Sequence, residues 1–168
     1  MTIRKAREQD IPQLLPLMRG LAEFEHYIDV FAITEKVILD HGFRRNPPSF
    51  HCFVAEDPET RTIAGMLVYY FIPYTAIAKP TMYIKELFVA PEARNLRIGE
   101  ALMKAAAREA VAHTCGVIKW EVAPWNKDSM RFYERLGAEQ NHDWVDYGMK
   151  PKAFKKLAGL DGSPGSQD

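Results

Sequence analysis

A predicted helical segment carries three polar side chains on a sheltered face, where they could bind a ligand. Residues 123–138 read APWNKDSMRFYERLGA, and at about 100° per residue the charged residues share one arc. Asn126, Ser129 and Tyr133 lie opposite that arc, beside Phe132 and Leu136. Each buried polar group needs a partner, because an unpaired one costs about 1–3 kcal/mol. The partner is either protein or a ligand; the pattern favours a ligand, and the phenol of Tyr133 is the group best suited to chemistry.

A second segment connects a predicted strand to a predicted helix. Residues 87–100 read LFVAPEARNLRIGE and place Arg94, Asn95, Arg97 and Gly99 in the connecting loop. A helix N-terminus offers unpaired N–H groups and about half a positive charge, which suits a phosphate or pyrophosphate. Asn95 and Gly99 tolerate the left-handed conformations that such a cradle needs. Taken alone, the loop favours an ordinary strand-to-helix connection whose arginines are solvated over a phosphate cradle.

The elements that must position these segments alternate between helix and strand. Patterning predicts strands over residues 2–7, 50–56, 62–71, 82–89, 117–122 and 144–150. It predicts helices from Asp10 (N-cap) to about His26, from Thr34 (N-cap) to near Gly42, and over 99–114, 127–136 and 153–157. The second and third strands form an antiparallel hairpin. The sequence therefore predicts one α/β domain over 1–158 with a mixed sheet, and a disordered tail over 159–168.

Composition excludes several classes of function. With 168 residues and a formal net charge of zero, the chain lacks the electrostatic footprint of a nucleic-acid or anionic-membrane binder. No apolar run approaches the roughly 18 residues of a membrane span, and no signal peptide is expected. Cys52 and Cys115 have no C-x-x-C spacing, so reduced cysteines in a cytoplasmic protein are expected. The histidines are dispersed without zinc-ligand spacing, so no metal is expected.

Together the two segments resemble the GNAT superfamily of N-acetyltransferases. In that family a loop of pattern R/Q-x-x-G-x-G/A binds the diphosphate of acetyl-CoA, and a later N-x-x-S helix bearing F-Y completes the site. The chain is similar in particular to diamine (spermidine/spermine) and thialysine N-acetyltransferases, in LAEFE, TEKVILDHGF, FHCFVAE, MLVYYF and VAPWN. The resemblance implies the GNAT fold, with a mixed, mostly antiparallel central sheet flanked by helices. It also implies acetyl-CoA as co-substrate and a homodimer.

The same resemblance implies two groups of site residues. The cofactor-binding residues that it implies are Leu87, Phe88, Val89, Arg94, Asn95, Leu96, Arg97, Ile98, Gly99, Glu100, Asn126, Ser129 and Tyr133. The substrate-binding residues are Phe24, Glu25, Lys85, Glu86 and Glu121.

Acetyl transfer to an amine needs a base and an acid. An alkyl ammonium of pKa about 10.4 must lose a proton before it attacks, which costs about 4.6 kcal/mol at pH 7. By resemblance Glu86 and Glu25 are the candidate bases, acting directly or through water, although each could equally be a solvated surface carboxylate. Backbone amides of residues 87–89 are the expected oxyanion donors. Tyr133 is positioned by resemblance to protonate the departing thiolate.

Two positions depart from the family pattern. Arg97 stands at the first loop glycine; we expect the cradle to survive, with Arg97 adding a charge-assisted contact to a phosphate. Lys85-Glu86 stands where the polyamine-acetylating relatives have consecutive acidic residues. A cation beside the acceptor channel should repel a polyamine, and with an anionic substrate Lys85 would instead bind a carboxylate.

The sequence therefore predicts an acetyl-CoA-dependent N-acetyltransferase. The acceptor is a primary amine of a small molecule (a diamine, polyamine or lysine analogue), which attacks the thioester directly. The alternatives are a protein or peptide lysine acetyltransferase and a catalytically silent acyl-CoA-binding module. Turnover by a Tyr133→Phe variant and a panel of amines would discriminate among them.

Overall fold

A computed structural model describes residues 1–73, 76–143 and 145–160. The chain forms two compact units, Met1–Met130 and Arg131–Asp168, and each is described by itself. Residues 161–168 of the predicted tail lie outside the described residues. The prediction of one domain over 1–158 stays a prediction.

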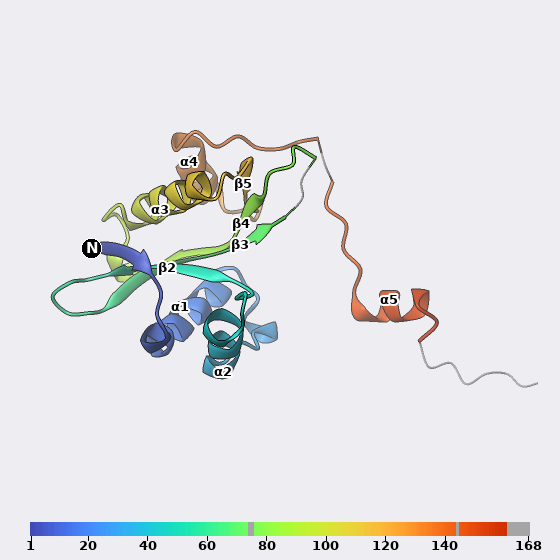
Figure 1. The fold of residues 1–168 in the computed structure, drawn as a ribbon, viewed down its shortest axis with the longest axis horizontal. Coiled ribbons are helices and arrows are strands. Elements are labelled where there is room, and N and C mark those ends of the chain that lie inside the picture. The colour runs from blue at the N-terminus through green and yellow to red at the C-terminus, as the bar shows by residue number, and fades with distance from the viewer. Residues whose placement is uncertain (74–75, 144, 161–168) are drawn as a thin grey trace, which may run out of the picture. The chain divides into compact units, whose positions relative to one another are not determined.

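Within the described residues, the first unit contains a five-stranded sheet in the order β1-β2-β3-β4-β5 (Figure 1). The strands are β1 (Thr2–Lys5), β2 (His51–Glu56), β3 (Ile63–Ile72), β4 (Thr81–Val89) and β5 (Val117–Lys119). The first four are antiparallel neighbours, and β5 is parallel to β4. The structure thus confirms the predicted hairpin and the mixed, mostly antiparallel sheet.

The helices are α1 (Ile11–Phe24), α2 (Glu35–Ile38), α3 (Ile98–Ala112), α4 (Lys127–Arg135) and α5 (Pro151–Leu157). Short turns accompany them: η1 (Glu8–Asp10), η2 (Ile28–Val30), the π-helical η3 (Leu39–Arg44) and η4 (Pro91–Ala93). In the first unit, α1 and α2 cover one face of the sheet and α3 covers the other (Figure 1). All five helices were predicted, with ends displaced by a few residues.

The two predicted N-cap residues, Asp10 and Thr34, both stand at the start of a helix, but only Thr34 caps its helix with its side chain. Thr34 caps α2, because its hydroxyl accepts a hydrogen bond from the Val37 N–H at 3.2 Å. Asp10 precedes α1 but its side chain does not cap the helix. Its carboxylate instead accepts two bonds from the Arg4 guanidinium, at 2.6 and 2.9 Å, and Arg4 also binds Glu56 at 2.7 Å. These charge-assisted hydrogen bonds engage the Asp10 carboxylate in place of the backbone N–H groups at the start of α1.

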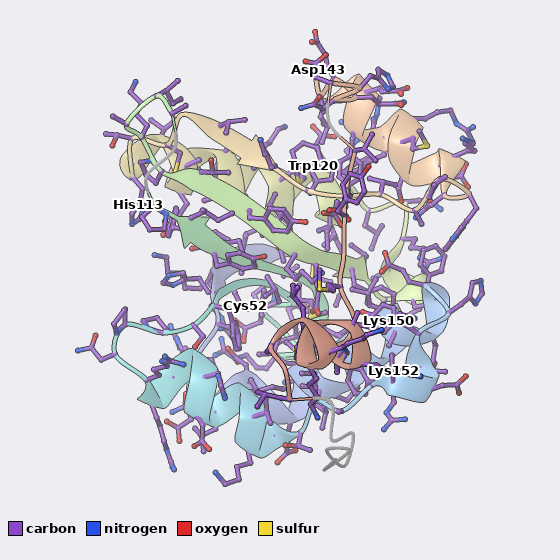
Figure 2. The ribbon with its side chains drawn as sticks, turned by 90° about the vertical axis from the view of Figure 1, so that its right-hand side faces the viewer. Cys52, His113, Trp120, Asp143, Lys150 and Lys152 are labelled. Carbon is purple, nitrogen blue, oxygen red and sulfur yellow. The ribbon has the colours of Figure 1, made fainter. Side chains whose placement is uncertain are left out.

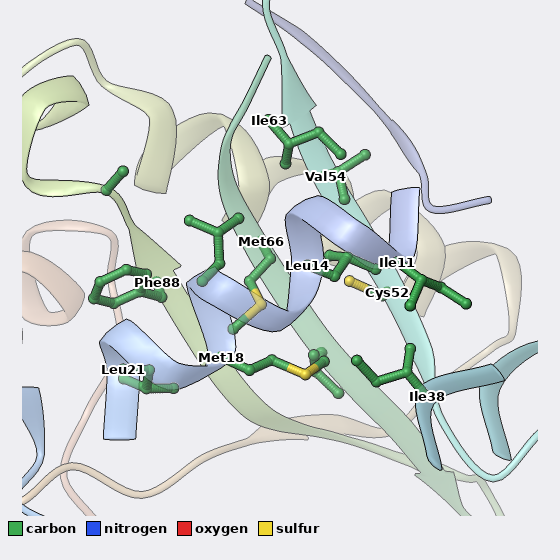
Figure 3. Packing of buried hydrophobic residues seen from close by; sticks show 13 residues of the cluster. Ile11, Leu14, Met18, Leu21, Ile38, Cys52, Val54, Ile63, Met66 and Phe88 are labelled. Carbon is green, nitrogen blue, oxygen red and sulfur yellow. The ribbon is translucent and has the colours of Figure 1, made fainter. Parts of the chain in front are cut away.

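Each face of the sheet has its own apolar core. Figure 3 shows Leu14 and Met18 of α1 packed over Met66 and Phe88 on one face. The other face packs against α3, and Trp120 adjoins that second core. Figure 2 shows Trp120 and Cys52 on opposite sides of the sheet. Because side chains alternate along a strand, each strand of the hairpin contributes to both cores.

The predicted strand over 144–150 does not form. Trp144 lies outside the described residues, and residues 145–150 have no strand structure. Val145, Tyr147 and Met149 are 78%, 91% and 56% exposed. A strand needs a neighbour for its backbone hydrogen bonds, and this segment pairs with none among the described residues. Across the residues that the structure describes, no helix has the length and apolar character needed to span a membrane.

Candidate active site

The end of α1 determines how the candidate acceptor residues are presented. Glu25 is the C-cap of α1, and the following His26 has a left-handed backbone with φ of 62°. The Tyr27 N–H donates to the Ala22 carbonyl at 2.9 Å, and the His26 N–H donates to the Glu23 carbonyl at 3.3 Å. This pair of bonds is a Schellman motif, which ends the helix and turns the chain. It fixes the backbone from which Glu25 and Tyr27 project.

An aromatic junction brings three distant segments together. The Phe24 ring contacts the Trp125 ring edge-to-face at 5.6 Å, and His26 lies 5.5 Å from the same indole. The Arg94 guanidinium lies 5.4 Å from the Phe24 ring, and its Nε donates to the Val89 carbonyl at 3.5 Å. The end of α1, the loop after β4 and the turn before α4 therefore meet here. Sequence reasoning missed Trp125 as a site residue, although it stands inside the APWN motif.

Strand β4 carries an irregularity at the candidate acceptor site. Val68 of β3 pairs with Glu86, whereas the next residue, Tyr69, pairs with Ile84. Lys85 is therefore the extra residue of a β-bulge, which bends a strand and redirects its side chains. Lys85 is exposed and Glu86 is half-buried.

Glu86 occupies an apolar position of the sheet. Cys52, Val68 and Glu86 stand opposite one another in register across β2, β3 and β4. Cys52 and Val68 belong to the core beneath α1, so the Glu86 carboxyl is withdrawn from water. Its Oε2 is buried and has no hydrogen-bond partner in the described part of the chain. This desolvation raises the pKa of Glu86 to about 7; the Lys85 ammonium opposes the shift, and the Glu25 carboxylate adds to it.

Glu25 and Tyr27 share the electrostatic surroundings of Glu86. Glu25 is exposed as a residue, yet partial burial of its carboxyl raises its pKa, again against the influence of Lys85. Burial raises the pKa of Tyr27 to about 12, with further contributions from Glu86 and Glu25. The structure thus brings Glu25, Lys85 and Glu86 within reach of one another's charges, and their roles in substrate binding and catalysis stay predictions. It adds Tyr27, which no motif in the sequence distinguishes.

At the C-terminal end of β4, some backbone N–H and C=O groups point away from β3. The Ala90 N–H donates to the Ala64 carbonyl of the β3 side at 2.9 Å. Because backbone groups alternate in direction along a strand, those of Leu87 and Val89 point to the opposite side. On that side β5 pairs with β4 only from Thr81 to Tyr83. The predicted strand over 117–122 was therefore too long, and its early end leaves the Leu87 and Val89 amides facing a side without a strand neighbour in the described residues.

The loop before α3 has the conformation expected of an anion cradle. Asn95 and Arg97 have left-handed backbones, with φ of 66° and 57°. No side chain caps α3, and the bond from the Ala101 N–H to the Arg97 carbonyl at 3.0 Å starts the helical pattern. The N–H groups of residues 98–100 therefore face the loop. Of the two residues that tolerate a left-handed backbone, Asn95 adopts it and Gly99 does not, because α3 begins at Ile98 and Gly99 is already helical.

The side chains of this loop differ in exposure. Arg94, Leu96 and Arg97 are exposed, whereas Ile98 is 2% exposed and anchors the helix in the core beneath α3. The Glu100 carboxylate pairs with the Lys104 ammonium at 2.8 Å. The cofactor-binding assignments of these residues stay predictions.

Arg97 at a left-handed position provides a test of the cradle. We expect Arg97→Gly to weaken coenzyme A binding about 3- to 10-fold through loss of a phosphate contact, while the melting temperature stays equal or rises. Arg97→Lys is the matched control, because it keeps the charge and the backbone strain. Calorimetric titration with coenzyme A and thermal melts measure both effects. Several-fold tighter binding by Arg97→Gly would show that Arg97 makes no such contact.

Two residues of the 123–138 motif have structural roles at the ends of α4. Asn126 is 8% exposed, and its side-chain oxygen accepts a bond from the Ser129 N–H at 3.1 Å, as an N-cap does. Gly137 has a φ of 89°, and the Ala138 N–H donates to the Tyr133 carbonyl at 3.1 Å. Asn126 thus starts α4, and Gly137 ends it with a second Schellman motif. Protein is the partner of the Asn126 oxygen, and ligand binding by this helix stays a prediction.

Tyr133 belongs to the second unit. Its ring is half-buried and packs edge-to-face on Phe132 at 5.0 Å. Ser129 is also half-buried, as the sheltered face predicted. Glu121 is exposed and lies beyond the end of β5 rather than within a strand.

Neither cysteine has the surroundings of a nucleophile. Cys52 and Cys115 are free thiols, as predicted, and burial raises the pKa of both. A reactive cysteine needs a lowered pKa, so the described residues offer no activated thiol to carry an acyl group. Among these residues no three histidine, cysteine or acidic side chains form a group that could hold a metal ion.

Comparison with known proteins places the chain in a family. The model of the Acetyltransferase (GNAT) family matches residues 16–138. A thialysine N-epsilon-acetyltransferase of Sus scrofa is 33% identical over 166 residues, covering 94% of this chain and 96% of that protein. A spermidine/spermine N(1)-acetyltransferase-like protein 1 of Homo sapiens is 30% identical, covering 81% of this chain and 20% of that protein. An integron cassette protein of V. cholerae shares the fold, with a TM-score of 0.76 at 23% identity over 94% of this chain and 96% of that one. The chain belongs to the GNAT family of acetyltransferases.

Proposed function

We propose that the protein transfers an acetyl group from acetyl-CoA to a primary amine of a small molecule. The observation that carries this proposal is Glu86, a carboxyl group with a buried, unpartnered oxygen and a pKa raised to about 7. A carboxyl group with a pKa near 7 is partly ionised at neutral pH. Its carboxylate form is a stronger base than an ordinary carboxylate and can accept the proton of an ammonium substrate. A core carboxyl with only a structural role would be expected to have a partner.

The donor would bind at the loop before α3. Left-handed Asn95 and Arg97 and the uncapped N-terminus of α3 form a cradle suited to a diphosphate. Arg94 and Arg97 are exposed there and add positive charge. We propose that Asn126, Ser129 and Tyr133 complete the acetyl-CoA site, as the family resemblance implies.

The proposed reaction is a direct attack on the thioester. Glu86 accepts the ammonium proton, directly or through water, and the amine nitrogen attacks the acetyl carbonyl carbon. The backbone N–H groups of Leu87 and Val89 are the proposed donors to the oxyanion. When the oxyanion collapses and the carbon–sulfur bond breaks, Tyr133 gives its proton to the thiolate, and the second proton lost from the nitrogen returns to the Tyr133 phenolate directly or through water. The raised thiol pKa values of Cys52 and Cys115 support this route over an acetyl-cysteine intermediate.

The relatives support a small acceptor. Their names specify thialysine and spermidine/spermine, so a diamine, a polyamine or a lysine analogue is the proposed substrate class. A peptide lysine acetyltransferase and a silent acyl-CoA-binding module are not favoured by these relatives. We place Glu25 and Phe24 in the acceptor site, because Glu25 shares the surroundings of Glu86 and Phe24 contacts the donor-loop arginine. Glu121 is proposed there on resemblance alone.

We further propose a homodimeric, cytoplasmic protein in which residues 1–158 act as one domain. The exposed apolar side chains of Val145, Tyr147 and Met149 alternate along a segment without a strand partner in the described residues. A second copy would cover them and supply a partner. The free cysteines agree with a reducing compartment.

A thiol-release assay with acetyl-CoA tests the function. The panel contains spermidine, putrescine, thialysine, lysine, ornithine, an aminoglycoside and a lysine-containing peptide. We expect release above the amine-free rate with at least one small amine, and a matching acetylated product by mass spectrometry. Tight coenzyme A binding without any acetylated amine would support the silent module, and turnover of the peptide alone would support the peptide acetyltransferase.

A further inference from the structure

The Lys85 ammonium is a cation at the proposed acceptor site, and no ion pair with another described residue neutralises it. Lys85 is the exposed extra residue of the β4 bulge, directly before Glu86. It forms no hydrogen bond or ion pair within the described residues. By contrast, Lys5 binds Glu109 at 2.6 Å and Lys104 binds Glu100 at 2.8 Å. The bulge therefore holds a positive charge that a ligand can use.

The field of Lys85 reaches both carboxyl groups of the site. It lowers the pKa of Glu86 and of Glu25, opposing the effect of burial on each. The site therefore combines the Lys85 ammonium with two carboxyl groups, of which Glu86 is the more deeply buried. Such a site complements a ligand that carries both signs of charge, with its amine at Glu86 and an anionic group at Lys85.

We propose that Lys85 binds the carboxylate of an α-amino acid whose side-chain amine is acetylated. This inference rests on the proposed function and names its substrate class. A diamine of the same chain length fits less well, because its second ammonium group lacks the adjacent carboxylate that would bind Lys85 and offset the repulsion between the two ammonium groups. Loss of the carboxylate from a partly exposed ion pair corresponds to about a 10-fold difference in kcat/KM.

Matched substrates isolate the carboxylate. Cadaverine is lysine without its carboxylate, and putrescine is ornithine without it, so each pair presents the same reacting amine. We expect the wild-type protein to favour lysine over cadaverine and ornithine over putrescine by about 10-fold in kcat/KM, mainly through KM. Lys85→Glu should reverse the preference, and Lys85→Gln should abolish it. Lys36→Glu, which alters an exposed lysine of α2 that pairs with Asp40 of η3, should leave the preference unchanged.

The outcomes separate this inference from the proposed function. Turnover of the diamines at rates equal to or above those of the amino acids, or an unchanged ratio in Lys85→Glu, would overturn the role of Lys85 while acetyl transfer stands. If no amine is acetylated, the proposed function fails, and calorimetric titration of lysine and cadaverine into the coenzyme A-bound protein decides the inference. Tighter binding of lysine that Lys85→Glu removes supports it; equal binding, or none, overturns it.

Discussion

Replacing Glu86 by glutamine is expected to lower kcat/KM for the amine by about 10²- to 10⁴-fold, the range for loss of a general base. The amide has nearly the shape of the carboxyl group but cannot accept the proton of the ammonium substrate. Because Oε2 is buried without a partner in the described residues, the substitution breaks no hydrogen bond there. The loss should therefore fall on turnover rather than on coenzyme A binding.

The pH dependence identifies the base. In the wild-type protein kcat/KM should rise through a limb near pH 7, where Glu86 loses its proton and becomes able to accept another. In Glu86→Gln that limb should disappear, leaving the rise caused by deprotonation of the amine itself. Glu59→Gln, in the exposed turn between β2 and β3, is the matched control and should keep the wild-type profile. If Glu25→Gln removes the limb and Glu86→Gln retains it, Glu25 is the base.

Stability should change in the opposite direction to activity. The pKa of Glu86 is raised from about 4.5 in the unfolded chain to about 7 in the folded one, so the folded state favours the protonated carboxyl. That stabilisation is fully present below pH 4.5 and is lost as the pH rises through 7. Glu86→Gln should therefore match the wild type at pH 4 and exceed it at pH 8, by up to about 3 kcal/mol in the free energy of unfolding. Denaturant titrations at both pH values measure this, and a less stable variant at pH 8 would contradict the burial of a charged group.

Tyr133→Phe is expected to lower kcat by about 10²- to 10³-fold while the affinity for coenzyme A changes little. The substitution removes only the phenolic oxygen and keeps the ring that packs on Phe132. Without an acid, the thiolate must leave unprotonated or take its proton from water. Tyr147→Phe, at a position 91% exposed, is the control that removes a phenol without this role. Unchanged turnover by Tyr133→Phe would assign the acid to another group, and the half-buried Tyr27 would be the next variant to measure.

Local patterns predicted most of the fold. The hairpin of β2 and β3, the cap of α2 by Thr34 and the position of α4 all follow from short-range periodicity and capping chemistry. The failures involve partners distant in sequence. Asp10 is diverted from capping by Arg4, and the segment over 145–150 lacks the neighbour that a strand requires.

The sequence named candidate members of the site but not their geometry. Motif resemblance named Glu86 and Lys85, yet the β4 bulge that separates their environments depends on pairing with β3. The sequence also left the backbone of Arg97 open, and the structure places it in the left-handed region despite its bulk. Tyr27 was missed because its relation to Glu86 depends on the turn after α1, where a histidine occupies the position usually held by glycine. Residue types thus indicated the chemistry, and tertiary pairing supplies the environments.

The most direct test of the central claim follows the acetyl group by mass. The protein is incubated with acetyl-CoA, with and without lysine. The masses of the intact protein and of the small molecules are then measured by mass spectrometry. Direct attack predicts one acetyl group on the amine for each coenzyme A released, and no acetyl group on the protein in either sample. An acetylated protein that forms without the amine and passes its acetyl group to it, or coenzyme A release without acetylated amine, would contradict the account.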